Sequence, residues 1–302
     1  MRPISTYPGS SPFTRANLRE LRRTITEEIY AALGLEPDTR LRHLLNPLVW
    51  APVRRFVQIA DRFDQAAGQL SFPEAARIVL SRFITRLEVD GGDSVPLKGP
   101  LLVAANHPGA ADVLAIAASL PRTDLKVVVS SLPFFRNLPN SARDFIYTAH
   151  ENTHQRMEVV RSSIRHLREG GSVLIFPRGL VEPDPELLPG AEESLAEWST
   201  SLGIIARAVP QAKVVPAIVS GVISRRSLRN PVTWLRSEPR ERQKLAEVLQ
   251  ILQQMMSPLR PAVSTRLSFG RPIRAIGEDA RAVTHQVVET ARRLLSEHMA
   301  AA

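Results

Sequence analysis

From residue 100 onward, short apolar runs alternate with helical patterns, and this alternation limits the possible folds more than any other feature of the chain. Short, continuous apolar runs are typical of strands buried on both faces, and strands joined by helical crossovers pair in parallel. We therefore expect an α/β fold, with a mainly parallel sheet flanked by helices. The four strand candidates are 101–105, 125–129, 173–176 and 214–219.

Helical patterns separate and follow these strands. They cover about 110–119, 153–168, 239–256 and 279–299. Alternating side chains predict one late strand, formed around Val263, Thr265, Leu267 and Phe269. No repeat and no low-complexity tract interrupts this order, so we expect residues 89–302 to form the α/β domain.

The first 88 residues have a different pattern. Residues 1–13 are rich in proline, serine and glycine, which predicts a flexible N-terminus. Residues 14–88 predict a helical region, whose first helix begins near Thr14 and ends at a C-cap, Gly34. Further on, two or three helices are expected, separated by prolines at positions 47, 52 and 73.

Four arginines crowd the first half of the first helix, at positions 15, 19, 22 and 23. A basic amphipathic helix can lie on anionic lipid. The alternative is a helix that packs its apolar face on the main domain and leaves its arginines in solvent. The sequence leaves both open.

The chain has a net charge of +9 and no cysteine, and its basic residues are 35 arginines and four lysines. The charge favours an anionic partner such as a phosphate or an anionic membrane surface. Scattered tyrosines and tryptophans and the absence of zinc-finger spacing argue against nucleic acid. Without cysteine, thiol catalysis is excluded. No secretory or membrane-spanning apolar segment is present, so we expect a cytoplasmic protein, soluble or peripheral on the inner face of the membrane.

The segment from Asn106 to Asp112 carries the strongest chemical signal. It follows a predicted buried strand and precedes a predicted helix, which is where α/β sheets bind ligands. His107 should project from this junction, with Asp112 about one helical turn further along. A histidine oriented by a carboxylate is the minimum apparatus for taking a proton from a hydroxyl group. A lone histidine would more often be structural, so the reading depends on further segments.

Those segments resemble the glycerolipid acyltransferases, which include glycerol-3-phosphate and 1-acylglycerol-3-phosphate O-acyltransferases. The family's first motif, Asn-His-x₄-Asp, is matched by Asn106, His107 and Asp112. Its third, Phe-Pro-Glu-Gly, and its fourth, Val-Pro in an apolar strand, follow in the family's order. The matching residues are Phe176, Pro177 and Gly179 for the third motif, with Arg178 in place of the acid, and Val215 and Pro216 for the fourth. The resemblance covers about residues 87–275.

The resemblance implies an acyltransferase of phospholipid synthesis in which His107 deprotonates a glycerol hydroxyl while Asp112 orients and charges the imidazole. The acyl donor would be acyl-CoA or acyl carrier protein, acting as co-substrate, with no other cofactor and no metal. The acceptor would be glycerol 3-phosphate, 1-acylglycerol 3-phosphate or another lysophospholipid. Asn106 is expected to help bind the substrate.

Phosphate recognition is less well marked. In the stretch that corresponds to the family's second motif, Arg136 and Arg143 are the candidates we retain. In the third motif, Arg178 beside Gly179 is a plausible phosphate ligand, because the glycine lets the backbone approach an anion. The substituted acid also motivates an alternative, an acyltransferase-like lipid-binding protein with weakened activity.

A second alternative comes from residues 150–154, which read His-Glu-x-x-His, the pattern of zinc peptidases. Such a site needs His150 and His154 on one face of a helix. However, Asn152 and Gln155 form an N-cap pattern, which places His150 before the helix. We therefore expect this segment to be a polar loop at the mouth of the cleft.

Overall fold

The computed structural model describes residues 14–37, 39–148, 153–256, 262–274 and 279–301. Within these residues the strands form one mixed sheet in the order β1-β7-β6-β2-β5-β3-β4, with β8 paired to β6. The strands are β1 (Arg86–Asp90), β2 (Leu101–Ala105), β3 (Leu125–Ser130), β4 (Phe145–Thr148), β5 (Ser172–Ile175), β6 (Lys213–Ser220), β7 (Ser264–Phe269) and β8 (Ile273–Arg274).

The sheet is mainly parallel, as expected. Strands β4, β3, β5, β2 and β6 all pair in parallel, and only β6 with β7 and β6 with β8 pair in the antiparallel sense. The four strand candidates and the late strand were predicted correctly to within one residue at each end. Strands β1, β4 and β8 were not expected.

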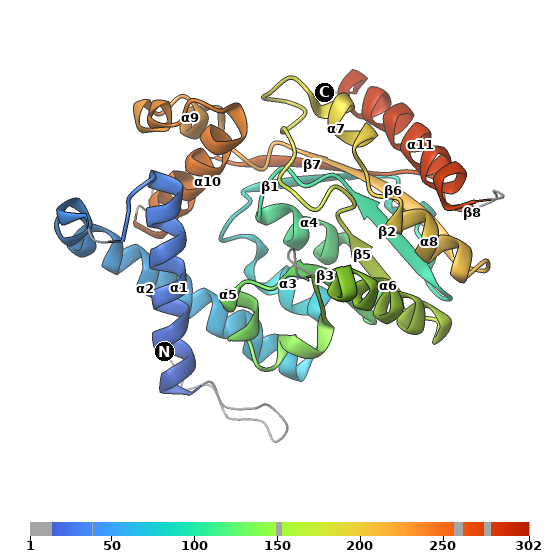
Figure 1. Cartoon of the computed structure of the whole chain (residues 1–302), viewed down its shortest axis with the longest axis horizontal. Coiled ribbons are helices and arrows are strands. Elements are labelled where there is room, and N and C mark those ends of the chain that lie inside the picture. Colours follow the sequence, from blue (N-terminus) through green and yellow to red (C-terminus); the bar gives the residue numbers. More distant parts are fainter. Residues whose placement is uncertain (1–13, 38, 149–152, 257–261, 275–278, 302) are drawn as a thin grey trace.

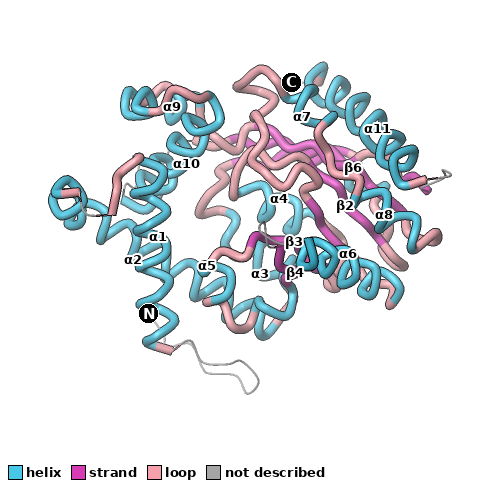
Figure 2. The backbone as a smooth tube through the Cα atoms, viewed as in Figure 1, coloured by secondary structure: helices cyan, strands magenta, loops and turns pink. Residues whose placement is uncertain are grey.

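Helices cover both faces of the sheet (Figures 1 and 2). The longer ones are α1 (Arg15–Leu33), α2 (Arg40–Gln69), α3 (Phe72–Leu80), α4 (Ala111–Ser119), α6 (Thr153–Arg168), α8 (Ser201–Ala208), α10 (Pro239–Met256) and α11 (Ala280–Ala300). Shorter helical turns are η1 (Gly92–Ser94), α5 (Pro133–Arg136), η2 (Ser141–Asp144), α7 (Ala191–Ala196), α9 (Arg225–Leu228) and η3 (Pro231–Leu235).

Strand β2 shows why a strand in the middle of this sheet consists only of apolar residues. All five of its side chains are buried, because successive residues point to opposite faces and both faces are covered. Leu101, Val103 and Ala105 pack into a core shared with α2, α3 and α4. Leu102 and Ala104 pack into a second core, shared with α6, α8 and α11.

The N-terminal helices belong to the first of these cores. A capping box at Thr14 and Asn17 starts α1, and Gly34 ends it in the left-handed conformation, as the sequence predicted. Leu21 and Ile29 are buried against the rest of the protein. The apolar face of α1 therefore packs on the main domain, which was one of the two alternatives for this helix. The expected boundary between residues 88 and 89 falls inside β1, which pairs with β7.

The expectation that prolines would divide the next region was partly wrong. Pro47 and Pro52 both lie inside α2, a continuous helix of 30 residues. A proline removes one backbone hydrogen bond from a helix, but α2 buries a long apolar face that includes Val53, Val57 and Phe63. Pro73, by contrast, sits in the first turn of α3, directly after its N-cap Ser71.

Among the described residues, no helix has both the length and the apolar character needed to cross a bilayer. The carboxyl ends of β2, β3, β4 and β5 meet at one edge of the sheet, as parallel pairing requires. The residues that follow these strand ends build the candidate site.

Candidate active site

The loop between β2 and α4 carries His107 and is fixed by the residue before it. The Asn106 side chain is buried, donates to the carbonyl of Val219 at 2.9 Å and accepts from the amide of the same residue at 2.8 Å. Both ends of the amide thus bind the backbone of β6. Asn106 was expected to help bind substrate, but the structure places it as a clamp between two strands, because its polar atoms face the sheet.

His107 and Asp112 lie together as predicted. Nδ1 of His107 is 2.9 Å from Oδ2 of Asp112, which also accepts from the backbone amide of Gly109 at 3.1 Å. The Asp112 side chain has no exposed surface, whereas a quarter of the His107 side chain is exposed. A carboxylate at Nδ1 selects the tautomer with its proton there, so Nε2 is the ring nitrogen that can accept a proton.

Several acidic groups raise the pKa of His107. Burial lowers the pKa of His107, but the charge and hydrogen bond of Asp112, with the charges of Glu247 and Glu182, outweigh it and raise the pKa above its usual value. A raised pKa makes the imidazole a stronger base. The site therefore favours transfer of a proton to Nε2 from a neutral hydroxyl group.

The third motif lies beside the histidine. The Phe176 ring follows β5 and lies 4.5 Å from the His107 ring, centre to centre. Pro177 then accepts a hydrogen bond from the Ser199 amide, which holds the turn. Gly179 has a φ of 72°, which glycine adopts without strain, and an added Cβ there would meet no neighbour within 4 Å. The segment forms an open turn beside the imidazole.

Arg178 is held on this turn by an ion pair. Its guanidinium lies 2.9 Å from Oε2 of Glu197 at one nitrogen and 3.1 Å at another. Only 16% of the Arg178 side chain is exposed, against 60% for Glu197. The structure thus puts an arginine at the edge of the site, with a largely exposed carboxylate as its partner.

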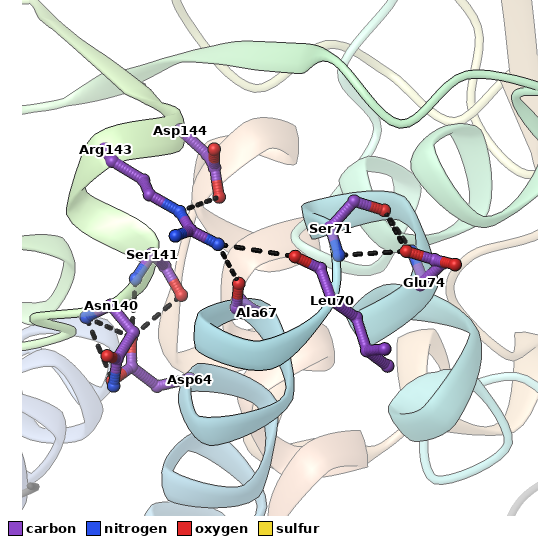
Figure 3. Close-up of polar contacts among 9 residues, drawn as sticks. All are labelled: Asp64, Ala67, Leu70, Ser71, Glu74, Asn140, Ser141, Arg143 and Asp144. Atoms are coloured by element: carbon purple, nitrogen blue, oxygen red, sulfur yellow. Dashed lines mark hydrogen bonds and ion pairs between the residues drawn. The ribbon is translucent and has the colours of Figure 1, made fainter. Parts of the chain in front are cut away.

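The other two predicted phosphate ligands lie elsewhere. Arg143 donates to the carbonyls of Ala67 and Leu70 at the end of α2, where it caps the last turn (Figure 3). The guanidinium of Arg136 lies 5.4 Å from the centre of the Tyr147 ring. One nitrogen of Arg143 thus binds backbone carbonyls and Arg136 lies over a tyrosine ring, so the phosphate-binding role expected of these two arginines stays a prediction.

The fourth motif supports the site from the sheet. Val215 and Pro216 lie in β6 opposite Val103 and Ala104 of β2. Pro216 has no amide to donate, but its carbonyl accepts from the Gly270 amide at 2.8 Å. An added Cβ at Gly270 would approach Pro216 to 2.7 Å, so a glycine is needed there. These residues hold the strand that clamps Asn106, and they take no part in lining the cavity below.

An apolar cavity of about 370 Å³ opens beside His107. Its wall contains His107, Phe176 and Gly179 at one end, and Ser130 and Thr148 from the ends of β3 and β4. The rest of the wall is mainly apolar and combines aliphatic with aromatic side chains. The phenylalanines that line it are Phe56, Phe63, Phe72, Phe83, Phe134, Phe135 and Phe145.

The cavity runs across the sheet. Strand β4, which contributes Phe145, is three strands away from β2, which leads to His107. Because neighbouring strands lie about 4.8 Å apart, these two residues are separated by roughly 14 Å across the sheet. At the distant end, the Phe72 ring contacts the rings of Phe63 and Phe145. The cavity is therefore long and mainly apolar, with His107 at one end.

Sequence reasoning missed three polar residues near His107. Glu182, buried after the third motif, donates its backbone amide to the carbonyl of His107 at 2.8 Å. Gln243 of α10 donates to the carbonyls of Pro108 and Glu182, both at 2.7 Å. Glu247, one turn along α10, accepts from the amide of Ala110 at 2.5 Å. The only available signal was the spacing of polar residues along α10, which the apolar pattern of that helix hid.

The zinc alternative falls mostly outside the described residues. His150 is not among them, and nothing can be said of the His154 side chain. Helix α6 begins at Thr153. In the part of the chain that the structure describes, no group of three or more histidine and acidic side chains could hold a metal ion.

Residues 86–220 match a protein-family model described as "Acyltransferase". The crystal structure of the 1-acyl-sn-glycerophosphate (LPA) acyltransferase PlsC from Thermotoga maritima is 15% identical in sequence. It superposes with a TM-score of 0.47 over 93% of this chain and 98% of that one. No curated protein sequence matches the chain. The family match begins at β1 and ends with β6, so it contains His107, Asp112 and the turn at Gly179 and excludes α10.

Proposed function

We propose that the protein, whose residues 86–220 match an acyltransferase family model, acylates a glycerol-phosphate acceptor in phospholipid synthesis. The acyl donor is acyl-CoA or acyl carrier protein. The acceptor is 1-acylglycerol 3-phosphate or glycerol 3-phosphate. One observation carries the proposal: a paired histidine and carboxylate face the end of a long apolar cavity.

In the proposed reaction, Nε2 of His107 takes the proton of the acceptor hydroxyl as its oxygen bonds to the thioester carbonyl carbon. The negative charge passes to the former carbonyl oxygen. When the carbonyl re-forms, the carbon–sulfur bond breaks, and the imidazolium returns its proton to the departing thiolate. Asp112 holds the ring and stabilises its charged form throughout. No acyl-enzyme forms and no metal or further cofactor is needed, which suits a chain without cysteine.

The fatty acyl chain would lie in the cavity among the phenylalanines. Each buried methylene contributes about 0.8 kcal/mol, so a chain that fills the cavity is held firmly without polar contacts. With the chain in this position, the thioester carbon lies at the end that contains His107 and Phe176. The cavity thus supports an acyl donor better than it supports a polar substrate.

Arg178 and Gly179 are the proposed ligands of the acceptor phosphate. Arginine binds phosphate through two parallel hydrogen bonds, and Arg178 stands on the turn that follows Phe176. Its partner Glu197 is largely exposed, so a phosphate can replace that carboxylate without burying it. The turn at Gly179 leaves room for the anion.

We also propose that the protein acts on the inner face of an anionic membrane. Helix α2 exposes Leu44, Leu48 and Trp50 at 73, 69 and 56% of their surfaces, and the Arg54 guanidinium lies over the Trp50 ring. Exposed apolar side chains beside arginine are typical of surfaces that enter an anionic lipid interface. In a flotation assay, a Leu44→Glu/Leu48→Glu variant should bind anionic vesicles less than the native protein. Equal binding would assign the contact elsewhere.

A lipid-binding protein with weakened activity is the second candidate, since Arg178 occupies the position of an acid in the family motif. Thioester turnover separates the two. Purified protein is incubated with acyl-CoA or acyl carrier protein and with each acceptor in turn. Acceptor-dependent release of free thiol, with formation of an ester, supports the enzyme. Tight acyl-chain binding with no turnover on any pair supports the binding protein.

A further inference from the structure

Helix α10 carries a polar stripe on the face that it turns toward the protein. Gln243, Glu247, Gln250 and Gln254 recur at spacings of four, three and four residues, which places them on one side of the helix. The three glutamines are almost fully buried. Each reaches across to backbone groups of another segment: Gln243 to Pro108, Gln250 to Val222 and Gln254 to Phe83. The stripe fastens α10 to the rest of the protein.

Glu247 performs the same fastening with an ionisable side chain. Its Oε1 accepts from the Ala110 amide at 2.5 Å, a bond that a glutamine oxygen would make equally well. The approach is close, since a Cβ at Gly109 would lie 2.7 Å from that oxygen. Glu247 lines the cavity together with Gln250 and Gln254 of the same stripe. It alone among the four stripe residues carries a carboxylate, where an amide would suffice for the backbone contact.

The carboxylates of Asp112 and Glu247 bind consecutive amides of the loop that carries His107. Asp112 accepts from Gly109, and Glu247 accepts from Ala110. Both negative charges act on the imidazole. Glu182 is the third group whose charge acts on His107, and burial raises its own pKa to about 7. Asp112 and Glu182 come from the family domain, whereas Glu247 comes from a helix that lies outside it.

We propose that Glu247 is a positioning residue of the His107 base, a second carboxylate that sets the basicity of the imidazole from α10. It does not touch the reacting atoms. It holds the loop at Ala110 and places a negative charge where it stabilises the imidazolium formed when the hydroxyl gives up its proton. This role of Glu247 rests on the proposed function in one respect: the function identifies the hydroxyl as that of the glycerol-phosphate acceptor.

The effect of Glu247 on His107 depends on pH, because Glu247 itself gains or loses its charge near neutral pH. Burial raises the pKa of Glu247 to about 7, against the opposing effects of the Ala110 amide and of His107. When Glu247 is ionised it raises the pKa of His107, and when it is protonated that contribution is lost. Removing the carboxylate should therefore lower the pKa of His107, so that the base is neutral down to a lower pH but is weaker.

The direct test is an NMR titration of the histidine imidazoles in Glu247→Gln and in the native protein, with no substrate present. The chain has seven histidines, and the His107→Ala spectrum identifies the signal of interest. We expect the pKa of His107 to fall by roughly half a unit or more in Glu247→Gln. Glu241→Gln is the matched control, because it removes a carboxylate of the same helix that pairs with Lys244 at the surface.

The second test is the pH dependence of kcat/KM for acyl transfer. In Glu247→Gln the acid limb should move to lower pH and the plateau should fall several-fold, while thermal unfolding stays near the native value because the amide keeps the Ala110 bond. Glu247→Asp, which retains the charge, should restore the acid limb in part. A merely structural role would leave the limb unmoved.

The two tests fail separately. An unchanged His107 pKa and an unchanged acid limb in Glu247→Gln would overturn the role of Glu247 while acyl transfer itself stood. A lowered His107 pKa in a protein that transfers no acyl group would support the role of Glu247 and overturn the proposed function.

Discussion

Nδ1 of His107 lies 2.9 Å from Oδ2 of Asp112, a carboxylate with no exposed surface at all. The pair joins the end of a buried strand to the first turn of a helix, across only five residues of chain. The same oxygen of Asp112 also accepts a hydrogen bond from the Gly109 amide. The geometry leaves the imidazole little freedom to rotate, and it fixes which nitrogen is the base.

Replacing Asp112 by asparagine should lower kcat by roughly 10²- to 10⁴-fold. The amide can still accept from Gly109, but it no longer stabilises the imidazolium and it permits the wrong tautomer. Steady-state rates with saturating donor and acceptor measure the effect. Circular dichroism and thermal unfolding of the same sample exclude a loss of fold, and a kcat within threefold of the native value would remove Asp112 from the mechanism.

Arg178→Ala should raise the acceptor KM by roughly ten- to a hundredfold and change kcat little, since a hydrogen bond to a charged group is worth about 1.5–3 kcal/mol. Glu197→Gln is the matched variant. It weakens the competing ion pair of Arg178, so the acceptor KM should stay equal or fall. An unchanged KM in Arg178→Ala would place the phosphate away from the third motif.

The length of the acyl chain should follow the free space in the cavity. Ala60 is a small buried residue of α2 in the cavity wall, and Ala60→Leu would occupy space that an acyl chain uses. We expect preference in a mixture of acyl donors to move toward shorter chains, by about 0.8 kcal/mol for each methylene excluded. Gln58→Leu, exposed on the same helix and outside the cavity, serves as the control. If Ala60→Leu and Gln58→Leu had the same acyl-chain preference, the cavity would not be the acyl site.

His298 should make stability fall in mild acid. Its ring nitrogens each lie 2.8 Å from a serine hydroxyl, of Ser220 and of Ser268, and burial lowers its pKa to about 4. The unfolded chain takes up a proton near pH 6.5 and the folded protein does not, so this contribution to stability is present above 6.5 and is lost progressively as the pH falls toward 4.

Denaturant titrations at pH 7 and pH 5 measure this effect. The stability lost between the two should be roughly 1–2 kcal/mol smaller in His298→Gln than in the native protein. Buried carboxyl groups with raised pKa values, such as Glu182 and Asp184, act in the opposite sense but are common to both proteins. His285→Gln, exposed on the same helix, should leave the difference unchanged. Identical losses in His298→Gln and the native protein would contradict the assignment.

The sequence predicted the parts of the site that local patterns specify. His107 and Asp112 are close in the chain, and the buried run of β2 and the first turn of α4 fix how they meet. The mainly parallel sheet also followed from the alternation of apolar runs and helical patterns, whereas the order of the strands in the sheet was not predicted.

Contacts between distant segments could not be predicted. Glu247 meets Ala110 across 137 residues, and nothing local distinguishes it from the glutamines of the same stripe. The contact of Arg143 with the end of α2 was not foreseen, because the sequence shows a charge and not its partner. Pro47 and Pro52 predicted helix ends, but the buried face of α2 outweighs the cost of two prolines. The short edge strands β1 and β4 lack the continuous apolar run that marked β2.

The central claim is that His107 is the base for acyl transfer to a glycerol-phosphate hydroxyl. The most direct measurement is acceptor-dependent thioester turnover by native protein and by His107→Ala, with folding of the variant checked by thermal unfolding. The account predicts turnover by the native protein and a loss of at least a thousandfold in His107→Ala, with donor binding in the cavity retained. Full acyl transfer by a folded His107→Ala protein would contradict it.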